Sequence, residues 1–157
     1  MCKEKKETKK KKSPSSKSKA KGSGWERDLA KLLSMWIYGQ ENVLRRHPTS
    51  GAEKGFGSGA DIANFNHEFP NLKKFIEAKR GYKDDLFNAR KQLLEWYDTA
   101  KPKNVNNYPI WIIWKILNRG VVLATDKKFK NVSPIFIINE LYVYDFKELM
   151  KIPYKEI

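Results

Sequence analysis

The 157-residue chain predicts an α/β fold in which helices flank a central mixed β-sheet, with the element order α-β-β-β-α-β. Two stretches, 23–38 and 85–99, place apolar residues at helical spacing, which is typical of helices that pack on a core. The stretch 108–117 is apolar almost throughout, as expected of a strand covered on both faces. No internal repeat is present, so these elements predict one domain.

The first helix is predicted to begin at Ser23 and to end at Gly39. Ser23 stands three residues before Glu26, which is a capping-box pattern, and glycine commonly ends helices. Glu26 therefore has two possible roles, as a capping residue or as a group that carries chemistry. A buried stripe is expected along this helix, formed by Trp25, Leu29, Leu32, Leu33 and Trp36.

Short strands and loops fill the rest of the chain. Strands are predicted at 41–46, at the short apolar piece 61–65 and at 72–80, with a glycine-rich loop at 47–59 that we expect to contact phosphate. The residues 101–104 form the exit loop of the second helix. Further short strands and a last helical turn are predicted at 121–125, 134–138, 141–144 and 146–150.

The chain is strongly basic, with 32 Lys and Arg residues against 18 Asp and Glu residues, a net charge of +14. Such a charge predicts a polyanionic partner, nucleic acid first of all, although a merely solvated basic surface is the alternative. Residues 1–22 hold ten lysines and two glutamates and are predicted to be a disordered tail, with residues 23–157 as the single folded domain. The tail carries +8 of the +14, which leaves the domain at +6. It serves either as an electrostatic arm for phosphates or as a solubilising extension.

The location expected from the sequence is the cytoplasm of a prokaryote or of a virus-infected host, with the nucleus also open. Cys2 is the one cysteine, which fits a reducing compartment and argues against a cysteine zinc site. No apolar run reaches about 18 residues, and the N-terminus lacks the apolar region of a signal peptide, so no membrane partner is expected.

The candidate site lies between Asp61 and Lys79. Glu77 and Lys79 are two residues apart on one strand and face the same side, and a hairpin can bring Asp61 beside them. Two carboxylates, one ammonium and the carbonyl of Ala78 suit a hard divalent cation next to a nucleophilic water. The alternative is a surface ion pair worth less than about 1 kcal/mol. Because Phe75 shares this face, the charges are expected to be partly buried, which favours a function.

These residues resemble the PD-(D/E)XK nuclease superfamily, and more closely its archaeal-type (cellular or viral) Holliday junction resolvases. The likeness covers roughly residues 22–115. It rests on a helix start with Ser23-Gly24-Trp25-Glu26-Arg27, on Arg45-Arg46 before Ser50-Gly51-Ala52, and on Asp61 followed by Glu77-Ala78-Lys79. Ala60 stands where the superfamily usually has proline before the aspartate.

The resemblance implies a restriction-endonuclease-like core and a Mg²⁺- or Mn²⁺-dependent endodeoxyribonuclease of DNA recombination and repair. It implies a homodimer that cuts branched DNA. The implied catalytic residues are Glu26, Asp61, Glu77, Lys79 and Ser50, and the implied metal ligands are Glu26, Asp61, Glu77 and Ala78. The implied nucleic-acid contacts are Arg45, Arg46, Ser50, Lys54 and Arg80.

Two alternatives stay open beside a junction resolvase. One is a restriction-like or replication and repair nuclease that acts on duplex or flap DNA. The other is a module of the same fold that binds nucleic acid without cutting it.

Overall fold

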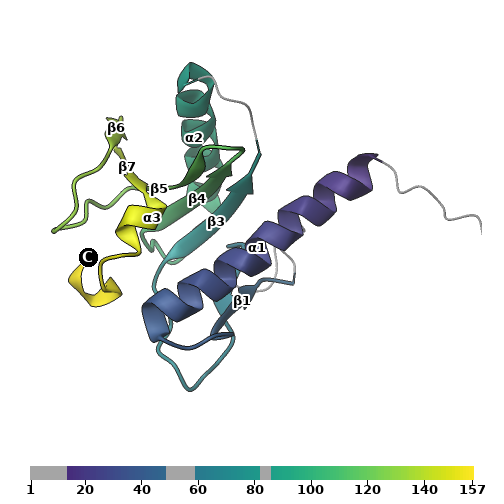
Figure 1. The fold of residues 1–157 in the computed structure, drawn as a ribbon, viewed down its shortest axis with the longest axis vertical. Coiled ribbons are helices and arrows are strands. Elements are labelled where there is room, and N and C mark those ends of the chain that lie inside the picture. Colours follow the sequence, from purple (N-terminus) through teal and green to yellow (C-terminus); the bar gives the residue numbers. More distant parts are fainter. Residues whose placement is uncertain (1–13, 49–58, 82–85) are drawn as a thin grey trace, which may run out of the picture.

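The computed structural model describes residues 14–48, 59–81 and 86–157. Within these ranges, seven strands form one mixed sheet in the order β1-β2-β3-β4-β5-β7-β6 (Figure 1). Strands β3 and β4 are parallel, and the other neighbours are antiparallel. The strands are β1 (Leu44–Arg46), β2 (Ile62–Asn64), β3 (Phe75–Arg80), β4 (Ile110–Ile116), β5 (Gly120–Thr125), β6 (Phe136–Ile138) and β7 (Leu141–Asp145).

Helices cover both faces of the sheet. The long helix α1 (Pro14–Tyr38) and the short helix α3 (Phe146–Leu149) pack on one face, and α2 (Leu86–Ala100) packs on the other (Figure 1). Two 3₁₀ turns complete the chain, η1 (Lys101–Lys103) directly after α2 and η2 (Tyr154–Glu156) near the C-terminus. The predicted α/β class and element order are confirmed. None of the described helices is both long enough and apolar enough to cross a membrane.

Strand β3 directs its side chains alternately into the two halves of the core. Ile76 and Ala78 belong to the apolar cluster under α1, whereas Phe75 belongs to the cluster under α2. Because side chains alternate along a strand, Glu77 and Lys79 share the face of Phe75. The expected partial burial of this face is confirmed, since Glu77 is only 4% exposed.

The predicted start of the first helix at Ser23 is wrong. Helix α1 already begins at Pro14, so Ser23 lies inside it and Glu26 is not in the first turn. A proline is tolerated at a helix start, and the lysines, alanine and serines that follow do not break a helix. Residues 14–22 of the expected disordered tail are therefore helical here, while residues 1–13 lie outside the described ranges. The predicted end is confirmed, because Gly39 adopts a φ of +68° directly after the helix.

The predicted buried stripe of α1 is correct except at Leu32, which is exposed, and at Trp36, which is partly buried. Trp25, Leu29 and Leu33 are buried, but Leu32 is 43% exposed. Ala30 and Ser34 are buried as well, so the face in contact with the sheet is centred nearer to Leu33. This rotation leaves Leu32 at the rim of the interface.

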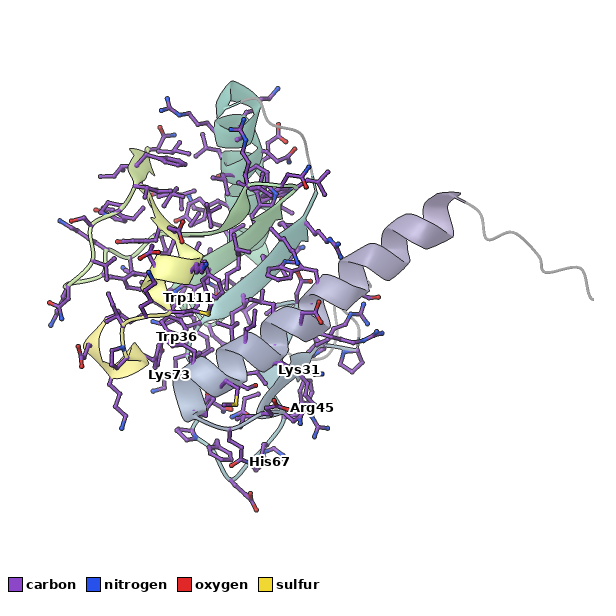
Figure 2. The ribbon with its side chains drawn as sticks, in the orientation of Figure 1. Lys31, Trp36, Arg45, His67, Lys73 and Trp111 are labelled. Carbon is purple, nitrogen blue, oxygen red and sulfur yellow. The ribbon has the colours of Figure 1, made fainter. Side chains whose placement is uncertain are left out.

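Two tryptophans of the sheet belong to the core. Trp111 and Trp114 of β4 are 0% and 2% exposed. Trp36 of α1 lies 6.2 Å from Trp111 between ring centroids, and Figure 2 labels this pair. The strands predicted at 134–138 and 141–144 correspond to β6 and β7, which are antiparallel about Asn139, whose φ is +51°.

One buried hydroxyl joins α1 to the edge of the sheet. Ser34 Oγ donates to the carbonyl of Ala30 at 2.7 Å and accepts the N–H of Leu44 at 2.8 Å. Leu44 opens β1, a strand of three residues that pairs with β2. The position of β1, and of Arg45 and Arg46 on it, therefore depends on this serine.

We expect Ser34→Ala to lower the free energy of unfolding by about 1–3 kcal/mol, because it leaves the buried N–H of Leu44 without its acceptor. Urea unfolding measures the loss. Thr99→Ala is the matched control, since the Thr99 hydroxyl bonds the carbonyl of Glu95 on an exposed helix surface. Equal effects of the two substitutions would show that the Ser34 contact does not hold β1.

Candidate active site

Asp61 lies beside β3 at the point where β2 begins. Its N–H donates to the carbonyl of Ile76 at 2.8 Å, and its Oδ2 accepts the N–H of Ala78 at 2.8 Å. The N–H and carbonyl of one strand residue point to the same edge, so the Ala78 carbonyl also points toward Asp61. The structure thus brings together Asp61 and Ala78, as the sequence predicts.

Glu77 and Lys79 complete the centre of the site. Lys79 Nζ lies 2.5 Å from Glu77 Oε2 and 5.9 Å from the ring centroid of Trp96 on α2. The side chain of Glu77 is 5% exposed, whereas that of Lys79 is 26% exposed. The pair is therefore not a solvated surface ion pair, which was the alternative reading of this triplet. A buried carboxylate needs compensating charge, and Lys79 supplies part of it.

Glu26 reaches the site from α1 and forms an ion pair with Arg46 of β1. Because α1 starts twelve residues earlier, at Pro14, a capping role for Glu26 is wrong. The carboxylate of Glu26 is close enough to Asp61 to act on its charge. Arg46, predicted to contact DNA, is held here against Glu26 instead of pointing freely at solvent.

The carboxyl group of Asp61 is strongly perturbed. Burial, and next the negative charge of Glu77, raise its pKa to about 7, against the opposing effects of Lys79 and the Ala78 N–H. Glu26 raises this pKa slightly further. Asp61 is thus a buried carboxyl group with other carboxylates nearby, and such perturbed groups are concentrated at functional sites.

The donor chemistry of Asp61 and Glu77 fits a hard divalent cation. Both offer carboxylate oxygens, and the Ala78 carbonyl at the same edge adds a third oxygen of the kind that Mg²⁺ and Mn²⁺ bind. Within the described ranges, however, no group of three or more His, Cys, Asp or Glu residues is arranged to hold an ion. The role of Glu26 as a direct third ligand accordingly stays a prediction.

Exposed basic side chains lie on α1 and β1, the elements that carry Glu26 and Arg46. Arg27 and Lys31 are exposed one turn apart on α1, and Arg45 is exposed on β1. Figure 2 shows Lys31 and Arg45 on these neighbouring elements. Arg80 is exposed at the end of β3. We call Arg27, Lys31 and Arg45 the α1–β1 basic surface.

Two predicted residues lie outside the described part of the chain. Ser50 and Lys54 belong to residues 49–58, between β1 and Gly59. Their predicted catalytic and phosphate-binding roles stay predictions.

The sequence patterns do not single out Lys103, which they place in the exit loop of the second helix. Its Nζ lies 3.7 Å from Glu77 Oε1, so it adds a second ammonium to the site. No local pattern signals this contact, because 26 residues separate Lys103 from Glu77 and only the crossover through α2 brings them together.

We expect Asp61→Asn to stabilise the metal-free protein at pH 8 but not at pH 4.5. An unfolded aspartate has a pKa near ~3.9 and the folded group about 7, so Asp61 contributes stability below ~4 that is lost as the pH rises through 7. Asparagine does not titrate and can still accept the Ala78 N–H. Relative to Asp61→Asn, the wild type should lose roughly 2–4 kcal/mol between these pH values, at about 1.4 kcal/mol per pKa unit.

Urea unfolding in EDTA at the two pH values measures this difference. Asp28→Asn, at an exposed position of α1, is the control. A stability gap between wild type and Asp61→Asn that does not change with pH would contradict the perturbed carboxyl group.

Comparison with known proteins agrees with this geometry. A model of the family described as "Phage putative PDDEXK endonuclease" matches residues 17–150, which is most of the chain. Searches of curated proteins and of solved structures gave no match. The matched range contains Glu26, Asp61, Glu77 and Lys79, together with every strand of the described sheet. The chain belongs to this endonuclease family, and with it to the PD-(D/E)XK nuclease superfamily.

Proposed function

We propose that this nuclease is a metal-dependent endonuclease that hydrolyses DNA phosphodiester bonds and selects branched DNA, most specifically a Holliday junction. The observation that carries the hydrolytic part is the grouping of Asp61, Glu77 and Lys79 about the edge of β3. The two carboxylates do not stabilise each other, because the negative charge of Glu77 raises the pKa of Asp61. Their proximity therefore favours a functional role over a structural one.

Asp61, Glu77 and the Ala78 carbonyl would hold Mg²⁺ or Mn²⁺, with Glu26 acting directly or through a water. A bound divalent ion supplies Lewis-acid stabilisation of phosphate charge and lowers the pKa of a coordinated water. The Ala78 N–H holds Asp61 Oδ2 in place, and Lys79 holds Glu77 Oε2, so each carboxylate has one oriented oxygen.

We assign to Lys79 a direct role at the attacking water and the scissile phosphate. Its ammonium can orient the attacking water or offset the charge that develops on the phosphate oxygens. Its contacts with Glu77 and with the Trp96 ring restrict where that ammonium lies. A preorganised cation of this kind needs little rearrangement during the reaction.

DNA binding would use the α1–β1 basic surface, Arg46, Arg80 and the lysine-rich residues 1–22, with Ser50 and Lys54 near the scissile phosphate. Contacts of this kind go to phosphates and position the DNA without reading its sequence. Selectivity would then come from the path of the DNA backbone. This is the reason for preferring a structure-selective enzyme.

Cutting a four-way junction into two duplexes needs two opposed nicks. Each chain has one Asp61–Glu77–Lys79 group, so two chains related by a two-fold axis would be required. A homodimer is therefore part of the proposal. A nuclease that acts on duplex or flap DNA is the alternative, and needs no such symmetry.

Asp61→Asn and Glu77→Gln should each lower the single-turnover rate of cleavage by roughly a thousandfold or more, because each removes a ligand worth several kcal/mol in the transition state. DNA affinity should stay the same or rise, since each change removes a negative charge near phosphates. Cleavage of labelled DNA with Mg²⁺ and gel-shift binding measure the two quantities.

Glu68→Gln, at an exposed glutamate of the turn before β3, is the control and should cleave at the wild-type rate. A folded Asp61→Asn or Glu77→Gln protein with near-normal Mg²⁺-dependent cleavage would remove the proposed site.

On synthetic four-way junctions labelled on each strand, we expect paired nicks placed symmetrically across the branch point. The same protein should cut a linear duplex at least about tenfold more slowly, because the duplex lacks the branch geometry. Light scattering of the junction complex should give two chains per junction. Equal cutting of junction and duplex, or one chain per junction, would favour the general-nuclease alternative.

A further inference from the structure

The buried carboxylate of Glu77 is shared by two lysines from different elements. Lys79 on β3 contacts Oε2 at 2.5 Å, and Lys103 on η1 lies 3.7 Å from Oε1. Two ammonium groups thus face a carboxylate whose side chain is 5% exposed. Lys79 accounts for the expected role of a lysine in this site, and Lys103 has no assigned role.

The main chain of Lys103 is held firmly in this position. The side chain of Asn104 donates to the carbonyl of Tyr108 at 2.6 Å and accepts the N–H of Tyr108 at 3.1 Å, which closes the turn that directly follows η1. Gly59, two residues before Asp61, packs directly against Lys103. A Cβ at Gly59 would lie 3.2 Å from the Lys103 Cβ. The segments that carry Asp61 and Lys103 therefore lie close together.

The ammonium of Lys103 is much less constrained than its main chain. The side chain is 47% exposed and its contact with Glu77 is long, whereas Lys79 is 26% exposed and its contact is short. A cation that binds Glu77 Oε1 competes with the ammonium of Lys103, which lies beside that oxygen. Of the two lysines, Lys103 is the one that can leave Glu77 at little cost.

We propose that Lys103 is a second phosphate-binding lysine of the site. It neutralises Glu77 while no metal is bound, and its ammonium moves to a non-bridging oxygen of the DNA phosphate when a divalent cation binds Glu77. An ammonium released beside a bound phosphate forms a charge-assisted hydrogen bond there. This inference rests on the proposed nuclease function.

The competing explanation is that Lys103 serves as a fixed counter-ion for Glu77. The two explanations predict opposite effects on metal binding. If Lys103 competes with the metal, its removal strengthens metal binding, because a positive charge leaves the neighbourhood of the ion. If Lys103 merely holds Glu77 in place, its removal weakens both metal binding and DNA binding.

The test compares Lys103→Ala and Lys103→Arg with Lys101→Ala. Lys101 is a matched control: it flanks the same Pro102, has the same 47% side-chain exposure, and pairs with Glu140 at 2.7 Å, away from Glu77. Calorimetric titration with Ca²⁺ and Mn²⁺ measures metal affinity. Gel-shift binding of a four-way junction and of a duplex, in EDTA and in Ca²⁺, measures phosphate contact without relying on cleavage.

We expect Lys103→Ala to bind both metals about fivefold more tightly than the wild type. In Ca²⁺ it should bind DNA about tenfold more weakly, while in EDTA it should differ no more than Lys101→Ala does. Single-turnover cleavage in Mg²⁺ should fall about tenfold or more. Lys103→Arg, which retains the charge, should recover most of the DNA affinity and cleavage.

Unchanged or weaker metal binding by a folded Lys103→Ala protein, with urea unfolding in EDTA as the check of folding, would overturn the proposal. A loss of DNA affinity that is the same in EDTA and Ca²⁺, or the same as that of Lys101→Ala, would overturn it too. These outcomes are distinguishable from a failure of the proposed nuclease function, because in that case the wild type itself would cut no DNA.

Discussion

The hydrogen bond from the Ala78 N–H to Asp61 Oδ2 fixes the geometry on which the site depends. Strand β2 pairs with β3 at Ile62 opposite Ile76, and the next outward-pointing N–H of β3 is that of Ala78. A carboxylate, rather than another strand residue, satisfies it. The main-chain pairing of β2 with β3 thus ends next to Glu77, where the Asp61 side chain replaces a main-chain acceptor.

The charges around this edge are balanced imperfectly. Glu77 is buried between Lys79 and Lys103, while Asp61 retains a carboxyl group whose pKa burial and Glu77 raise to about 7. A purely structural core would replace such groups with apolar residues at no loss of stability. The divalent cation proposed above would relieve the repulsion between Asp61 and Glu77.

The scaffold that positions these groups is partly made of very short elements. Strand β1 has three residues and is tied to α1 through Ser34, and its Arg46 pairs with Glu26 of the same helix. Helix α1 therefore contributes both the buried support of the sheet edge and an acidic side chain near Asp61. Buried polar contacts hold this edge where so short a strand has few ladder hydrogen bonds.

The local patterns of the sequence determined the elements and the central triplet. Alternation along β3 placed Glu77 and Lys79 on one face, and the continuous apolar run of β4 implied a strand buried on both sides, because strand geometry depends on neighbours in sequence. Helical spacing likewise predicted a helix at 85–99, and each end lies within one residue of the observed α2.

Tertiary structure decided the start of α1, the partner of Glu26, the exposure of Leu32 and the arrival of Lys103 at Glu77. A capping box at Ser23 resembles a helix start, but whether a helix begins there depends on what precedes it. Ion pairs such as Arg46–Glu26 and Lys103–Glu77 join residues 20 and 26 positions apart, so the packing of whole elements creates them. Such contacts produce no periodic pattern in the sequence, because the three-dimensional fold alone determines them.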